Sequence, residues 1–127
     1  IKRNSKDTCF SCFKELFENL HFTHDQNDLS TFYNSYIDLM SFWNSSLKNY
    51  IHTVNYEDLV DSTKSNVIQM LKFCELDFEE NCLNFKENKS AVRTISISQV
   101  RNPIYKSSVG SYKYYEGNLK ILFDNLK

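Results

Sequence analysis

Apolar residues recur at helical spacing along much of this 127-residue chain. Two long stripes of this kind predict a first helix that begins after a cap at Ser5 or Asp7, and a second from Asp28 to about Leu47. The first stripe consists of Cys9, Cys12, Phe13, Leu16, Phe17 and Leu20, and the second of Leu29, Phe32, Tyr33, Tyr36, Ile37, Met40, Trp43 and Leu47. We expect both stripes to face the core.

Shorter patterns fill in the rest of the chain. Residues 1–3 are interpreted as the end of a strand, and residues 50–54 alternate and include β-branched side chains, which predicts a short strand. Helices are predicted from about 62 to 74, from 78 to 85 and from 112 to 126, with residues 86–107 irregular. Strand, helix, helix, strand, helix is the order of an α/β protein, here mostly helical with a few short parallel strands.

Composition and charge narrow the class of protein. The length fits one domain, or part of one, over residues 1–127, with 41% apolar residues and a net charge of −1. This charge argues against bulk attraction to nucleic acid or to an anionic membrane. No apolar run approaches the roughly 20 residues that a membrane-spanning helix needs.

Positive charge gathers in one late segment. Residues 88–115 contain no Asp or Glu, and they hold Lys89, Arg93, Arg101, Lys106 and Lys113 together with the chain's one proline, Pro103, and Gly110. A near-neutral chain that places its cations in one loop-like segment indicates a site for an anion.

A second candidate anion site lies near the N-terminus. Arg3 follows the predicted strand end, and Ser11 lies in the helix that comes next. Ligands gather at the carboxyl ends of strands in open α/β sheets, and a helix N-terminus offers backbone N–H groups to a phosphate. Arginine adds a bidentate fork and serine a hydroxyl donor. Taken alone, the pattern also fits an ordinary surface arginine.

The four cysteines stand at positions 9, 12, 74 and 82. Cys9 and Cys12 have C-x-x-C spacing on an apolar helix face, which favours buried, reduced thiols. A zinc site with His21 or His24 has little support because no second C-x-x-C follows. A disulfide is expected only in an oxidising compartment.

Three stretches together resemble the nucleotide-binding parts of the sulfotransferase superfamily, most closely the bacterial proteins often fused to tetratricopeptide repeats and their protein-tyrosine sulfotransferase relatives. The R-[DN]-x-x-D-x-x-x-S pattern stands as Arg3 to Ser11, the Y-E-x-L-V pattern as Tyr56 to Val60, and the T-x-S-x-x-Q-V-R-x-P-[IV]-Y pattern as Thr94 to Tyr105, followed by the run Ser107-Ser108-Val109-Gly110. The likeness extends over essentially the whole chain.

The resemblance implies roles for five residues. Arg3 and Ser11 would grip the 3′-phosphate of 3′-phosphoadenosine 5′-phosphosulfate (PAPS). Tyr56 would lie against the nucleotide, or else be a core tyrosine. Ser96 would approach the transferring sulfuryl group or its bridging oxygen, and is the one catalytic contact expected here. Arg101 would neutralise phosphate or fix its loop.

Two departures qualify the likeness. The tyrosine sulfotransferases have a lysine before a tryptophan where this chain has Ser111-Tyr112, so a lysine contact there is in doubt, although Lys106 or Lys113 can substitute. Nothing resembles the family's Gly-rich 5′-phosphosulfate loop, and the catalytic base near it is missing. We therefore expect the chain to be the C-terminal portion of a sulfotransferase domain with a P-loop-like fold.

The resemblance implies transfer of a sulfuryl group from PAPS to a hydroxyl or amine acceptor, leaving adenosine 3′,5′-bisphosphate (PAP), in a longer protein that can carry tetratricopeptide repeats. We expect these 127 residues alone to be inactive, and no metal to be needed. The alternative is a non-catalytic nucleotide-binding module or a degenerate remnant. The predicted buried cysteines favour the cytoplasm, whereas the tyrosine-sulfating relatives work in the Golgi lumen.

Overall fold

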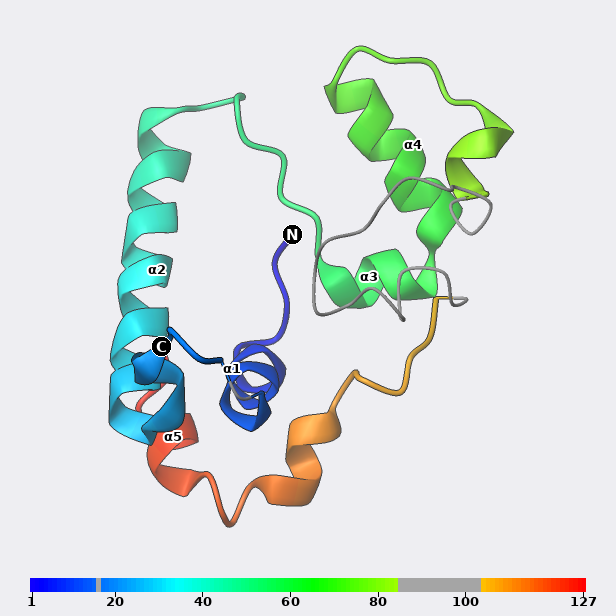
Figure 1. The fold of residues 1–127 in the computed structure, drawn as a ribbon. Helices are drawn as coiled ribbons and strands as arrows, with labels where there is room; N and C mark the ends of the chain where they lie inside the picture. The colour runs from blue at the N-terminus through cyan, green and yellow to red at the C-terminus, as the bar shows by residue number, and fades with distance from the viewer. Residues whose placement is uncertain (16, 85–103) are drawn as a thin grey trace. The chain divides into compact units, whose positions relative to one another are not determined.

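The computed structural model describes residues 1–15, 17–84 and 104–127 (Figure 1). The chain divides into two compact units, one formed by Ile1–Thr53 with Ser107–Lys127, and one formed by Val54–Lys106. The structure is mostly helical, as predicted. Its α-helices are α1 (Ser5–Lys14), α2 (Gln26–Ser46), α3 (Tyr56–Asp61), α4 (Thr63–Phe73) and α5 (Lys120–Asp124), and its 3-10 helices are η1 (His21–His24), η2 (Glu80–Leu83) and η5 (Ser111–Tyr115).

The two long helices of the first unit begin at side-chain caps. The Asn4 side chain accepts a hydrogen bond from the backbone N–H of Asp7 at 3.1 Å, so Asn4 caps α1 rather than Ser5 or Asp7. The Asp25 carboxylate accepts from the N–H groups of Asn27 and Asp28 at 2.8 and 3.0 Å and caps α2. These acceptors satisfy N–H groups that have no partner inside the helix.

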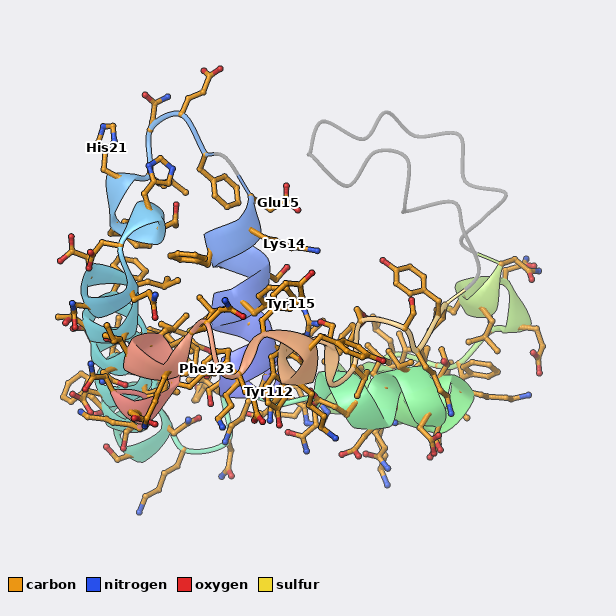
Figure 2. The ribbon with its side chains drawn as sticks, turned by 90° about the horizontal axis from the view of Figure 1, so that it is seen from below. Lys14, Glu15, His21, Tyr112, Tyr115 and Phe123 are labelled. Atoms are coloured by element: carbon orange, nitrogen blue, oxygen red, sulfur yellow. The ribbon has the colours of Figure 1, made fainter. Side chains whose placement is uncertain are left out.

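The core of the first unit lies where α1, α2 and the C-terminal segment meet. Its buried members are Cys9, Phe10, Leu29, Tyr33, Leu119, Leu122 and Phe123. Two ring pairs join η5 to this core: Phe10 stacks on Tyr115 with centroids 4.7 Å apart, and Tyr112 meets Phe123 edge-on at 5.7 Å. Figure 2 shows Tyr112 near Phe123, and Tyr115 beside α1.

Polar bonds hold the C-terminal segment against α2. The Gln26 side chain accepts from the N–H of Leu122 at 3.1 Å, and the Asn34 amide donates to the carbonyl of Asn125 at 2.7 Å. α5 lies beside the first turns of α2 in Figure 1, with the C-terminus close to that helix. The last residues of the chain thereby complete the core begun by the first.

The described residues of the second unit are built around two short helices. α3 and α4 pack on each other, and the Asn66 side chain donates to the carbonyls of Asp58 and Ser62 at 3.0 Å, which ties the two helices together. Val54 and Val60 are buried, whereas α4 has no buried residue. Among its described residues, 54–84 and 104–106, the second unit therefore buries few apolar side chains.

Several predicted elements are wrong in type or extent. No β-strand forms among the described residues: of the strands predicted at 1–3 and 50–54, only isolated bridge residues remain, at Lys2 and, directly after the second, at Asn55. A strand needs a neighbour to accept its backbone hydrogen bonds, and periodicity alone does not supply one. α1 ends at Lys14 rather than continuing to Leu20, because Glu15 takes an extended conformation with ψ 133°.

The C-terminal helix predicted over 112–126 is two short helices separated by a turn at 116–119. Gly117 lies in that turn, and glycine is a poor residue for a helix interior. The helix predicted over 78–85 is the 3-10 helix η2 among its described residues.

Nor is the whole α2 stripe in the core. Leu29 and Tyr33 are buried, but Phe32, Tyr36, Trp43 and Leu47 are 55, 39, 40 and 41% exposed. Among the described residues, no helix has the length and hydropathy of a membrane span.

Candidate functional site

Arg3 and Ser11, the two residues predicted to bind the 3′-phosphate, line one cavity of about 690 Å³ in the first unit. Lys2 and Thr8 also lie in its wall. The remaining wall comes largely from apolar side chains of α1, η1 and α2. The cavity wall therefore carries cationic and hydroxyl-bearing side chains, and the cavity volume falls within the usual range for small-molecule sites.

A turn from the far end of the chain closes against this end of α1. The guanidinium Nη2 of Arg3 donates to the carbonyl of Ser108 at 2.7 Å. This bond fixes the direction of the Arg3 side chain, and it joins two of the stretches that carry the family resemblance.

Asp7 is the anchor of that turn. Its side chain is 1% exposed, and its carboxylate accepts from the backbone N–H of Gly110 at 2.6 Å, from the N–H of Tyr112 at 3.2 Å and from the Ser111 hydroxyl at 3.3 Å. A buried carboxylate is stable only when such donors replace water. Asp7 therefore holds residues 110–112 against the first turn of α1.

Gly110 makes the turn possible. Its φ of +77° lies in the left-handed region, which side-chain-bearing residues rarely adopt. In this conformation the Gly110 N–H reaches Asp7, and the 3-10 helix η5 begins at the next residue.

The two thiols of the first helix also belong to the cavity wall. Cys9 is fully buried, Cys12 is half-buried, and both are free. Burial raises the pKa of the Cys9 thiol to about 12, and the neighbouring Cys12 adds to this shift. Burial also raises the pKa of Cys12, while the positive charge of Arg3 acts in the opposite direction. The predicted burial is confirmed for Cys9, whereas Cys74 and Cys82 are exposed.

Comparison with known proteins agrees with the motif at the start of α1. A family model described as "Sulfotransferase family" matches residues 1–80. The chain belongs to the sulfotransferase family. This match covers Arg3, Ser11 and the Tyr56–Val60 stretch.

One relative matches the whole length of this chain. An uncharacterized protein of Aquifex aeolicus (strain VF5) is 30% identical over 131 residues, which cover all of this chain and 17% of the relative. The chain thus spans a small part of that protein's length. No solved structure matches the chain.

The other residues assigned by likeness to the sulfotransferase family are not all in the first unit. Tyr56 is half-buried and is the first residue of α3 in the second unit, followed by the half-buried Glu57. Ser96 and Arg101 lie outside the described residues, and their predicted roles stay predictions. So do the cations Lys89 and Arg93.

Lys106 and Lys113 are the two candidates to replace the family's lysine contact. Lys106 forms an ion pair with Asp61, and this bond lowers the pKa of the Asp61 carboxyl. Lys113 is exposed in η5, with its aliphatic stem near Gly110. Among residues 1–15, 17–84 and 104–127, no group of three or more His, Cys, Asp or Glu side chains is arranged to hold a metal ion.

Sequence reasoning missed two features of the site. It treated Asp7 as a helix cap, although the fifth position of the R-[DN]-x-x-D-x-x-x-S pattern was a signal that this carboxylate has a fixed task. It also placed Cys9 and Cys12 only in the core, whereas both border the cavity that holds Arg3 and Ser11. The available signal was their place in the sequence: Cys9 and Cys12 flank Ser11 within one helical turn.

Proposed function

We propose that this chain is the 3′-phosphate-binding part of a PAPS-dependent sulfotransferase whose other parts lie in a longer protein. The supporting observation is that Arg3 and Ser11 line one cavity of the first unit, and that a hydrogen bond to the Ser108 carbonyl orients the Arg3 guanidinium. A guanidinium and a hydroxyl form a donor set suited to a phosphate dianion.

In the proposed reaction a hydroxyl or amine acceptor attacks the sulfur of PAPS. The bond from sulfur to the bridging oxygen breaks, PAP leaves, and a base takes the acceptor proton. Arg3 and Ser11 hold the nucleotide, and Tyr56 lies against it. Ser96 contacts the sulfuryl oxygen or the bridging oxygen, and Arg101 offsets phosphate charge. The base and the groups around the 5′-phosphosulfate come from the rest of the protein, so we expect this chain alone to transfer no sulfuryl group above background.

The test compares PAP with adenosine 5′-monophosphate, which lacks the 3′-phosphate, by isothermal titration calorimetry. Arg3→Ala should weaken PAP binding about tenfold or more, since a charge-assisted hydrogen bond contributes roughly 1.5–3 kcal/mol. Binding of the monophosphate should change little, because Arg3 contacts only the phosphate that this ligand lacks.

The matched control is Lys14→Ala, which removes a cation from the last turn of the same helix, away from the cavity lining. It should leave PAP affinity unchanged. If Arg3→Ala weakened the binding of both nucleotides equally, or left PAP affinity unchanged, Arg3 would not hold a 3′-phosphate. Circular dichroism of each variant checks that α1 is intact.

A further inference from the structure

The nucleotide site leaves one motif without a role, the C-x-x-C pair of α1. Cys9 and Cys12 are both free thiols, and both line the cavity that holds Arg3. Ser11, the proposed phosphate ligand, stands between them in the sequence. Any covalent change that joins the two sulfurs must therefore act on the backbone that carries Ser11.

Helix geometry decides what kind of bond these thiols can make. Residues three apart in an α-helix have Cα atoms about 5 Å apart, which is within the range of disulfides. Their Cβ atoms are about 5–6 Å apart, beyond the roughly 3.5–4.5 Å of a relaxed disulfide. The bond can close only if α1 deforms between Cys9 and Cys12. Strain of this kind makes a disulfide easy to reduce, which suits a reversible bond better than a structural one.

We propose that Cys9 and Cys12 are a reversible thiol–disulfide switch in the wall of the nucleotide cavity. The oxidant is a low-molecular-mass disulfide. The Cys12 sulfur attacks one sulfur of this reagent, forms a mixed disulfide and releases one thiolate. The Cys9 thiol then loses its proton and attacks the Cys12 sulfur, which forms the Cys9–Cys12 bond and releases the second thiolate. Two protein thiols are oxidised, and one reagent disulfide is reduced to two thiols.

The surroundings of the two sulfurs set this order of attack. Cys12 is half-buried, so an external reagent can reach it more readily than the fully buried Cys9; burial raises the pKa of the Cys12 thiol, and the positive charge of Arg3 opposes this shift. Cys9 is fully buried with its pKa raised to about 12, so it is a poor nucleophile toward an external reagent. Once Cys12 carries the mixed disulfide one helical turn away, the reaction of Cys9 becomes intramolecular.

The deformation also reaches the nucleotide ligands. Closing the bond alters the backbone over Cys9-Phe10-Ser11-Cys12, and Phe10 stacks on Tyr115 at the end of η5, whose first residues Asp7 holds. We expect the oxidised chain to bind PAP at least tenfold more weakly than the reduced chain. This regulatory step rests on the proposed function, whereas disulfide formation itself does not.

The chemical test uses a chain in which the exposed Cys74 and Cys82 are both replaced by serine. After incubation with oxidised glutathione, intact mass and peptide mapping should show a product two hydrogen atoms lighter, with Cys9 joined to Cys12, and dithiothreitol should restore the starting mass. Adding Cys9→Ser should trap glutathione on Cys12, and adding Cys12→Ser should abolish both products. Unmodified thiols, or a mixed disulfide that persists when both cysteines are present, would overturn the proposal. The chain that keeps both cysteines carries the main readout, so a Cys9 variant that fails to fold leaves the test intact.

The binding test measures PAP affinity of the same chain before and after oxidation. We expect the affinity for PAP to fall on oxidation and to return on reduction. In the Cys12→Ser variant, oxidation should leave the affinity unchanged. An oxidised chain with unchanged PAP affinity would overturn the switch. A reduced chain that fails to bind PAP would instead count against the nucleotide site, and the mass result would still decide whether the disulfide forms.

Discussion

At the scale of single residues, Asp7 matters more to this structure than any other charged side chain among the described residues of the first unit. It is fully buried, and its partners are two backbone N–H groups and one hydroxyl from residues more than 100 positions away. Its place in the first turn of α1 also puts the negative charge at the favourable end of the helix dipole. One carboxylate thus connects the two ends of the chain.

Replacement of this carboxylate tests its importance. Asp7→Asn presents an amide NH₂ to N–H groups that need an acceptor, and leaving such groups unsatisfied costs about 1–3 kcal/mol. We expect the free energy of unfolding, measured with urea, to fall by about this amount.

The control is Asp28→Asn, which changes an exposed carboxylate in the first turn of α2. It loses only the favourable interaction with the helix dipole, about 0.3–1 kcal/mol. If both variants lose the same stability, the buried bonds of Asp7 are not its main contribution.

At the scale of elements, the turn that leads into η5 depends on one backbone conformation. Gly110 has φ +77°, and a methyl group added there meets only the flexible side chain of Lys113, at 3.6 Å. Gly110→Ala should therefore lower the free energy of unfolding by about 1–2 kcal/mol, because alanine is strained in the left-handed conformation, with little added steric clash. Urea unfolding measures this loss.

Gly117 provides a matched control for that substitution. Its φ is outside the left-handed region and no atom lies within 4 Å of an added methyl group. Gly117→Ala should leave stability unchanged or raise it by about 0.4–1 kcal/mol, because it restricts the unfolded chain. A larger loss in Gly117→Ala than in Gly110→Ala would contradict this account of the turn.

Helices were predictable where local signals decide them. The helix predicted over 62–74 is α4, Thr63–Phe73, with Ser62 and Cys74 as its flanking caps, and the second predicted helix begins within two residues of Gln26. The strands were not predictable in this way, because a strand depends on a partner strand that sequence periodicity does not reveal. The same limit applies to the α2 stripe: an apolar helical face indicates burial, but it does not say which of its turns is covered, and Phe32 and Trp43 are exposed.

The candidate site was predictable to a similar degree. The sequence motif identified Arg3 and Ser11 as candidates, and both line one cavity in the structure. A hydrogen bond to Ser108 orients Arg3, and Asp7 holds the turn that follows Ser108. Both contacts join residues more than 100 positions apart, so no local sequence pattern contains them. Ser96 and Arg101 lie outside the described residues, so their roles rest on the motif alone.

At the scale of the whole molecule, the two units differ in how much apolar surface they bury among the described residues. The first has a cluster of seven buried residues drawn from α1, α2 and the C-terminal segment. The second has Val54 and Val60, and α4 contributes no buried side chain. Regions with few buried contacts open at lower free energy than the core.

Hydrogen exchange measured by mass spectrometry on the intact chain tests this difference. Amides of α4, within Thr63–Phe73, should exchange faster than those of α1 and of the first half of α2, because opening α4 exposes little apolar surface. Leu122→Ala, which truncates a fully buried side chain in the first unit, should speed exchange in α1 and α2 while α4 changes little. Equal protection of α4 and α1, or an equal response of all three helices to Leu122→Ala, would show that the chain unfolds as one cooperative body.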